Sequence, residues 1–316
     1  MLGTVPVARR QWPVTEPYDF WQTTRLLRTG GRDPTVVREP NGLWRTTHTV
    51  AGPATVRIRV LGTSNRVVGA WAWGPGAEAA LEDVPRWVGL HEAPWVLPAH
   101  PVTDRLLHEH PGIRMTDTRA VFEAVVNAVL QQLVTWNEAA MTWRRLVEGL
   151  GEPAPRPGSP DSALPPELEA LRLSPTADAM LRAGEATLQS YGIGRKRART
   201  LLHVARVAHV LEQAADLPTE RAAAHLEKVR GIGPWTSATV LGMRLGRPEP
   251  VLLGDFHLPN TVAWALAGEP RGSEERMVEL LAPFAGHAFQ VVRLIYAANL
   301  TAPRRGPKRA LRTTGR

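Results

Sequence analysis

The chain has 316 residues, of which 38 are Lys or Arg and 30 are Asp or Glu, so its net charge at pH 7 is +8. A basic chain of this length can hold two domains and favours a polyanionic partner. It contains no cysteine, which excludes disulfides, cysteine-ligated zinc and iron–sulfur clusters. It has no apolar run of about 18 residues and no secretory apolar core at its start, so we expect a cytoplasmic protein without a membrane span.

Residues 1–110 are expected to form a small α+β domain with an antiparallel sheet. Residues 55–60 alternate apolar and polar side chains, which is typical of a half-buried strand. Residues 42–50 and 67–73 are expected to be neighbouring strands, and residues 77–87 a helix. The domain holds seven of the chain's 11 tryptophans.

Residues 111–300 are expected to form a helical domain. Helical periodicity dominates from about residue 115 onward, and a Pro-rich stretch, residues 153–166, interrupts it as a loop. The fold class predicted from these patterns is therefore mainly α with an N-terminal α+β domain.

Two Gly-Ile-Gly turns lie in the helical part, at 192–194 and 231–233. Each is followed, 22 residues after its second glycine, by an aspartate, Asp216 in one case and Asp255 in the other. Only Asp255 comes directly after an apolar run, at 251–253. We expect the first turn to be a plain helix start whose basic side chains can contact phosphates; these are Arg195, Lys196, Arg197 and Arg199.

The second turn is predicted to join two helices in a hairpin over residues 219–246. Apolar residues within 222–229 repeat at the helical spacing, and Gly231 ends that helix because glycine reaches positive φ freely. Gly233 and the following proline start the next helix. Backbone N–H groups at such a start can bind a phosphate without reading sequence. The alternative is a glycine-rich turn between two core helices.

Asp255 is expected at or near a helix start, where an ionised carboxylate is favoured. Pro259 falls in the first turn after it and lacks an N–H, so we expect the helix to restart at Asn260. An ordinary helix cap is the alternative role for this carboxylate.

The hairpin followed by Gly254-Asp255 resembles the helix–hairpin–helix DNA glycosylase superfamily. Within it, the chain is most similar to the bacterial 3-methyladenine DNA glycosylase II branch. Residues 110–134 resemble that branch's first core helix, and residues 192–198 resemble its middle helical turn. The resemblance covers roughly residues 12–300 and implies the helix–hairpin–helix glycosylase fold.

The resemblance also implies roles for single residues. Asp255 matches the catalytic aspartate, and Leu133 matches the wedge that fills the hole left by a flipped base. Aromatic residues of the base pocket are matched by Trp235, Phe256 and Tyr296. Each aromatic residue, and Leu133 even more so, has core packing as its alternative role.

DNA contacts are expected at the hairpin backbone and beside the wedge, from Gly231, Gly233, Thr236 and Gln132. No cofactor and no side-chain metal site is expected. By resemblance, the backbone carbonyls of Val229 and Gly231 are candidate ligands of a monovalent cation.

We therefore expect a monofunctional glycosylase that removes alkylated purines from DNA. The nucleotide is rotated out of the duplex, aromatic faces attract the cationic base, and Asp255 stabilises the cation-like sugar. Bifunctional relatives carry a nucleophilic lysine where Trp235 stands, so the strand should stay intact. Two alternatives remain open: a non-catalytic DNA-binding or damage-sensing protein, and a glycosylase of the same fold for oxidised, deaminated or mismatched bases.

Residues 301–316 hold six basic side chains and no acidic one, and without them the net charge is about +2. This tail is expected to be disordered, either as a DNA-binding arm or as a solubilising end. The expected partner is damaged double-stranded DNA, bound by a monomer that acts at the bacterial nucleoid.

Overall fold

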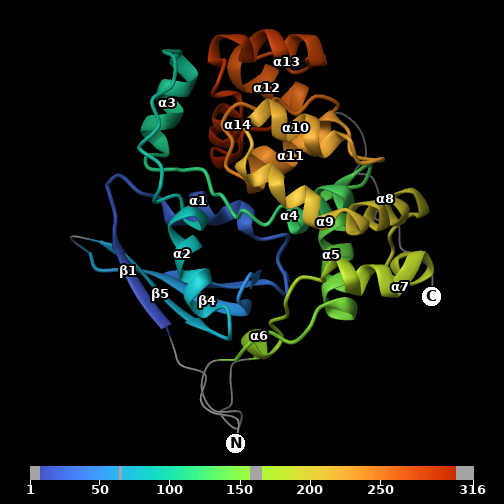
Figure 1. Ribbon diagram of the computed structural model, residues 1–316. Helices are drawn as coiled ribbons and strands as arrows, with labels where there is room; N and C mark the ends of the chain where they lie inside the picture. The colour runs from blue at the N-terminus through green and yellow to red at the C-terminus, as the bar shows by residue number, and fades with distance from the viewer. Residues whose placement is uncertain (1–7, 64–65, 157–165, 304–316) are drawn as a thin grey trace, which may run out of the picture.

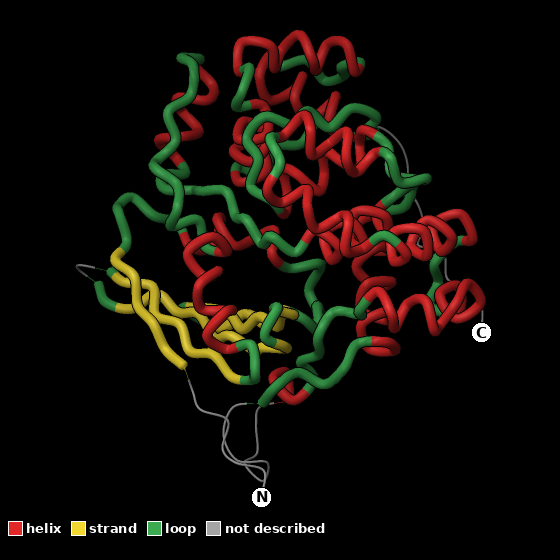
Figure 2. Tube along the Cα trace, viewed as in Figure 1, coloured by secondary structure: helices red, strands yellow, loops and turns green. Residues whose placement is uncertain are grey.

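The computed structural model describes residues 8–63, 66–156 and 166–303. The basic tail falls almost wholly outside these residues, as do residues 157–165 of the Pro-rich stretch. Figures 1 and 2 show a sheet with most of the helices gathered beyond one of its faces. The fold class predicted from the sequence, mainly α with a small N-terminal antiparallel sheet, is confirmed.

The sheet is antiparallel with strand order β1-β5-β4-β3-β2. Its strands are β1 Ala8–Pro13, β2 Val36–Glu39, β3 Gly42–Thr49, β4 Gly52–Leu61 and β5 Val67–Trp73. The predicted strand at 55–60 lies within β4, where Ala54, Val56 and Ile58 are buried. These alternate side chains pack against the buried face of α2, the helix predicted at residues 77–87.

The first helical segments are α1 Phe20–Thr24, the 3₁₀ turn η1 Arg25–Leu27, α2 Ala77–Trp87, α3 Pro101–Glu109, α4 Val121–Gln131, α5 Trp136–Leu150 and α6 Pro166–Glu169. The next are α7 Ala177–Ser190, α8 Arg195–Arg206, α9 Ala208–Leu211, η2 Glu212–Asp216, α10 Thr219–Glu227 and α11 Pro234–Arg244. The last are α12 Leu258–Ala267, α13 Glu274–Leu281, η3 Ala282–Phe284 and α14 Ala288–Ala297.

The helices enclose two apolar cores. One is built mainly from α4, α5, α8, α10 and α11, and the other from α3, α12, α13 and α14. Leu106 of α3 belongs to the second core, so α3 packs with the C-terminal helices rather than with the sheet. The proposed division of the chain at residue 110 stays a prediction.

Buried arginines tie the N-terminal segment around α1 and η1 to the helical part. Arg244 of α11 donates to the carbonyl of Leu27 at 2.9 Å and to the Thr29 hydroxyl at 2.7 Å. Arg293 of α14 donates to the carbonyl of Gln22 at 2.6 Å, and burial lowers the pKa of Arg293 to about 10. The guanidinium therefore stays charged at neutral pH, and each bond to a carbonyl is charge-assisted.

Among the described residues, no single helix is both long and apolar enough to cross a membrane. One pair passes by length and composition when joined, Glu274–Phe284 with Ala288–Ala297, but its two halves meet at a bend of 105°.

Candidate active site

The predicted hairpin is present between α10 and α11. Gly231 has φ +99°, and a Cβ placed there would lie 2.2 Å from the Thr200 hydroxyl oxygen of α8. Ile232 is buried in the core between the two glycines. Gly233 caps α11 with extended backbone, and a Cβ at this position would meet open space. The turn is thus anchored at Gly231 and open to solvent at Gly233.

Gln132, at the end of α4, is held against this hairpin. Its amide nitrogen donates to the carbonyl of Gly231 at 3.0 Å and to the Thr236 hydroxyl at 2.9 Å. Three of the predicted DNA-contact residues are therefore brought together, although Gln132 is 99 positions from Gly231 and 104 from Thr236 in the sequence. The side chain of Gln132 fixes the position of the residue that follows it.

Leu133 is that following residue, and its side chain is 91% exposed. Its backbone has φ +58°, a left-handed conformation that a leucine adopts only at a cost. The next helix begins directly afterwards with a capping box between Thr135 and Glu138. Core packing, the alternative role for Leu133, is therefore wrong, because the side chain projects into solvent.

Asp255 is held by three N–H donors. The indole of Trp235 donates to Oδ2 at 3.0 Å, and the backbone N–H groups of His257 and Leu258 donate to Oδ1, each at 2.8 Å. These three hydrogen bonds fix the orientation of the carboxylate. The aspartate and the aromatic residue predicted for one site are thus in direct contact.

The helix after Asp255 begins at Leu258, so the prediction of a start at Asn260 is wrong. Pro259 occupies the first turn, where a backbone N–H has no partner within the helix and its loss costs nothing. Asp255 caps this helix from two residues before its N-cap, because Oδ1 accepts the N–H groups at the helix start. The alternative role as a cap is therefore real, but it uses one carboxylate oxygen only.

Tyr296 lies on α14 beside this carboxylate. Burial, and secondly the negative charge of Asp255, raise the pKa of the Tyr296 phenol, which therefore stays protonated at neutral pH. Tyr296, Trp235 and Leu26 of η1 all pack against the C-terminal core. Trp235 and Tyr296 thus form an aromatic wall next to Asp255.

Phe256 does not join this wall. Its side chain is 85% exposed, and its ring meets the His257 ring edge-on at 4.9 Å between centroids. The structure therefore brings Trp235 and Tyr296 to the carboxylate but leaves Phe256 in solvent, outside the base pocket that the sequence predicted.

The first Gly-Ile-Gly turn is a helix start, as expected, and its aspartate is engaged elsewhere. Asp216 forms an ion pair with Arg119 at 2.6 Å and does not face the turn. The availability of the basic side chains of α8 to phosphates stays a prediction, since Arg195 and Arg199 keep 71% and 51% side-chain exposure. Arg195 and Arg199 both pair with Glu185, and Arg197 donates to the carbonyl of Leu130.

The two candidate cation ligands each accept one hydrogen bond. The carbonyl of Val229 accepts from the Ile232 N–H at 3.0 Å, and that of Gly231 accepts from Gln132. A carbonyl oxygen has two lone pairs, so both retain the capacity to bind a monovalent cation. Within the described part of the chain, no group of three or more His, Asp or Glu side chains is arranged to hold a metal ion.

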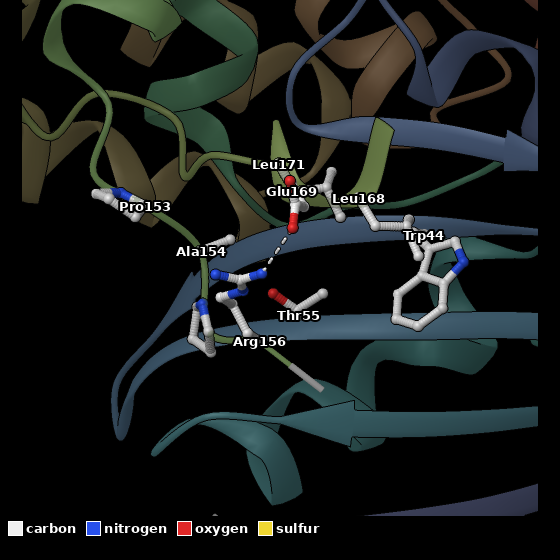
Figure 3. A pocket seen from close by; sticks show the side chains of 9 residues that line it. Trp44, Thr55, Pro153, Ala154, Arg156, Leu168, Glu169 and Leu171 are labelled. Atoms are coloured by element: carbon white, nitrogen blue, oxygen red, sulfur yellow. Dashed lines mark hydrogen bonds and ion pairs between the residues drawn. The ribbon is translucent and has the colours of Figure 1, made fainter. Parts of the chain in front are cut away.

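Figure 3 shows a pocket on the sheet, away from these residues. It lies between β3, β4 and the segment before α6, and the ion pair of Arg156 with Glu169 crosses it. Its volume of about 90 Å³ has room for roughly three waters, too little for a purine. None of the predicted site residues lines it.

The sequence pattern of the family described as "HhH-GPD superfamily base excision DNA repair protein" matches residues 126–284, which is half of the chain. The chain belongs to this family. The match spans the hairpin, Asp255 and the Gln132–Leu133 pair, so the site described above lies wholly within it apart from Leu26 and Tyr296.

Known proteins of similar sequence and structure agree with this assignment. The Bacillus subtilis protein YfjP, provisionally named a DNA-3-methyladenine glycosylase, is 26% identical over 163 residues, about half the length of either chain. The 3-methyladenine DNA glycosylase of Archaeoglobus fulgidus has a TM-score of 0.75 at 19% identity, covering 92% of this chain and 98% of its own.

Two further structures have the same fold. MBOgg1, solved with a low-affinity DNA ligand, has a TM-score of 0.66 at 14% identity and covers 95% of this chain and 97% of its own. The 8-oxoguanine glycosylase/lyase of Clostridium acetobutylicum has a TM-score of 0.63 at 13% identity, with coverages of 93% and 98%. At these identities the likeness establishes the fold alone.

Two features of the site had no signal in the sequence. Glu274, at the start of α13, accepts a hydrogen bond from the backbone N–H of Gly254 and so fixes the turn that carries Asp255. Arg25 of η1 donates to the carbonyl of Tyr296 at 3.1 Å and ties the N-terminal segment to the pocket wall. Both contacts join segments that are distant in the chain, so no local sequence pattern predicts them.

Proposed function

We propose that this protein is a monofunctional DNA glycosylase that hydrolyses the N-glycosidic bond of alkylated purines such as 3-methyladenine. The observation that carries the proposal is the Asp255 carboxylate. It accepts three hydrogen bonds, and one of them comes from Trp235 in the first turn of the hairpin helix α11. A protein that only binds DNA has no need of a carboxylate facing the substrate, since DNA is an anion.

The hairpin is suited to hold the DNA backbone. The N-terminus of α11 carries partial positive charge, and the open space at Gly233 lets a phosphate approach the backbone closely. Such a contact reads no sequence, which suits an enzyme that must find damage anywhere. The proposed partner is therefore damaged double-stranded DNA, bound by one copy of the chain in the bacterial cytoplasm.

The damaged nucleotide must leave the duplex before it can react. Rotating it out costs a few kcal/mol, and an apolar side chain such as Leu133 offsets this by filling the vacated space. The displaced base then lies against Trp235 and Tyr296, whose ring faces attract a positively charged alkylpurine. A neutral purine gains less from these faces.

The chemical step needs one negative charge. As the bond from C1′ to the base nitrogen breaks, its electron pair leaves with the base and the sugar becomes cationic. Asp255 stabilises that charge, and a water molecule adds to C1′ and releases one proton to the solvent. By the family resemblance, Trp235 stands in place of the nucleophilic lysine of bifunctional enzymes, so no covalent sugar adduct forms and the strand is not cut.

The test is the release of free bases from duplex DNA. Wild-type protein is incubated with duplexes that contain 3-methyladenine, 7-methylguanine, hypoxanthine or 8-oxoguanine, and strand scission is followed on a gel. We expect release of 3-methyladenine without strand cleavage. Release of 8-oxoguanine alone would favour the alternative glycosylase, and tight binding without any release would favour a damage sensor.

A further inference from the structure

Two large apolar residues close in the chain to the proposed site, Leu133 and Phe256, are exposed to solvent. Leu133 and Phe256 are 91% and 85% exposed. Leaving such a side chain in water forgoes roughly 1.5–3 kcal/mol that burial would provide. A pair of them beside a reactive carboxylate indicates that a partner covers both.

Two hydrogen bonds connect the neighbours of these residues to the first turn of α11. Gln132, next to Leu133, donates to Thr236 at 2.9 Å. Trp235, next to Thr236, donates to Asp255 at 3.0 Å, and Phe256 follows Asp255 directly. Leu133 and Phe256 each directly follow a residue whose side chain is hydrogen-bonded to the helix start that binds the DNA backbone in the proposed function.

Both side chains stand on rigid turns. Leu133 lies between the end of α4 and the capping box of α5. Phe256 lies within the loop that Asp255 closes by accepting the N–H groups of His257 and Leu258. Because hydrogen bonds hold the residues on either side of each turn, each side chain is presented on an ordered turn.

We propose that Phe256 is a second wedge, which inserts into the minor groove of the DNA beside the nucleotide that Leu133 replaces. Apolar side chains, Phe and Leu among them, enter the minor groove between base steps and unstack them. Asp255 must lie at C1′ of the displaced nucleotide, so the adjacent Phe256 reaches the neighbouring step of the duplex. The inference rests on the proposed function and changes the role of Phe256 from pocket wall to DNA contact.

The test uses a duplex with a tetrahydrofuran abasic analogue, which places no base in the pocket. A side chain that contacts only the displaced base should leave the binding of this duplex unchanged, whereas loss of a wedge should weaken it. We expect Phe256→Ala to weaken binding about tenfold, in line with the loss of one stacked aromatic contact. A 2-aminopurine beside the analogue should also lose the fluorescence increase that wild-type protein produces on unstacking it.

Three comparisons make the result decisive. Leu133→Ala should weaken binding similarly, while Val50→Ala, a fully exposed residue at the β3–β4 turn, should bind like wild type. The salt dependence of binding should be the same in Phe256→Ala as in wild type, because no charge is removed. Thermal unfolding checks that Phe256→Ala remains folded, as expected for so exposed a side chain.

Two results would overturn the inference, and they distinguish failure of the wedge from failure of the proposed function. If Phe256→Ala binds the abasic duplex like wild type but releases bases more slowly, the ring acts on the displaced base and is no wedge. If wild-type protein does not prefer the abasic duplex to an undamaged one, the proposed function itself fails and the wedge fails with it.

Discussion

The two glycines of the hairpin are under different constraints. Substitutions at these positions therefore distinguish an effect on folding from an effect on DNA binding. Gly231 has positive φ and no room for a Cβ, whereas Gly233 has extended backbone and open space. Gly231→Ala should therefore lower the free energy of unfolding by about 1–3 kcal/mol, measured by urea denaturation. Gly233→Ala should fold like wild type but bind duplex DNA more weakly, because the methyl group occupies the space that a phosphate needs.

The Gly231→Ala and Gly233→Ala variants serve as controls for each other, because the same substitution is made two residues apart. Titration of a fluorescent undamaged duplex measures the affinity of each folded variant. If Gly233→Ala binds that duplex with wild-type affinity, the backbone of the hairpin does not contact the phosphates.

At the scale of elements, Asp255 serves the helix as well as the site. Its Oδ1 accepts the N–H groups at the start of α12, and Oδ2 accepts the Trp235 indole N–H. Asp255→Ala should lose the cap and lower the free energy of unfolding by about 1 kcal/mol, while Asp255→Asn keeps an oxygen for the cap and should cost less. Equal unfolding curves for the two variants would show that the cap contributes nothing.

The elements that the sequence predicted well have a local signal. The strand at 55–60 and the helix at 77–87 show their own periodicity, and the hairpin at 219–246 has glycines where backbone conformation demands them. The predicted start of α12 is two residues too late, because the missing N–H of Pro259 removes no hydrogen bond in the first turn.

The exposure of single side chains and the partners of charged residues could not be predicted from local sequence patterns. Whether an apolar side chain such as Leu133 or Phe256 is buried depends on which segments pack around it. The pairing of Arg195 and Arg199 with Glu185 likewise depends on how α7 and α8 lie together. The residue types at the site were thus predictable, but their exposure and partners needed the tertiary structure.

At the scale of the whole molecule, most of the net positive charge lies in the C-terminal tail. A chain that ends at Pro303 loses six basic residues, and its net charge falls from +8 to about +2. If the tail contacts DNA, truncation should weaken binding to undamaged duplex and reduce the slope of log affinity against log salt, by about 0.9 for each lost phosphate contact. Fluorescence anisotropy between 50 and 200 mM salt, roughly the range in which such slopes are measured, provides the test.

A chain whose tail is replaced by Gly and Ser of equal length is the control for length. If the truncated and full-length chains show the same salt slope, the tail is a solubilising end and the folded body supplies every phosphate contact.

The central claim is that the Asp255 carboxylate stabilises a cationic sugar during base release. The most direct measurement is single-turnover release of 3-methyladenine from duplex DNA by wild type and Asp255→Asn, with the affinity of both for the abasic duplex measured in parallel. We predict unchanged or tighter binding and a loss of about 100-fold to 1,000-fold in the rate, because the asparagine keeps the hydrogen-bonding oxygen but not the charge. Release by Asp255→Asn at the wild-type rate would contradict the claim.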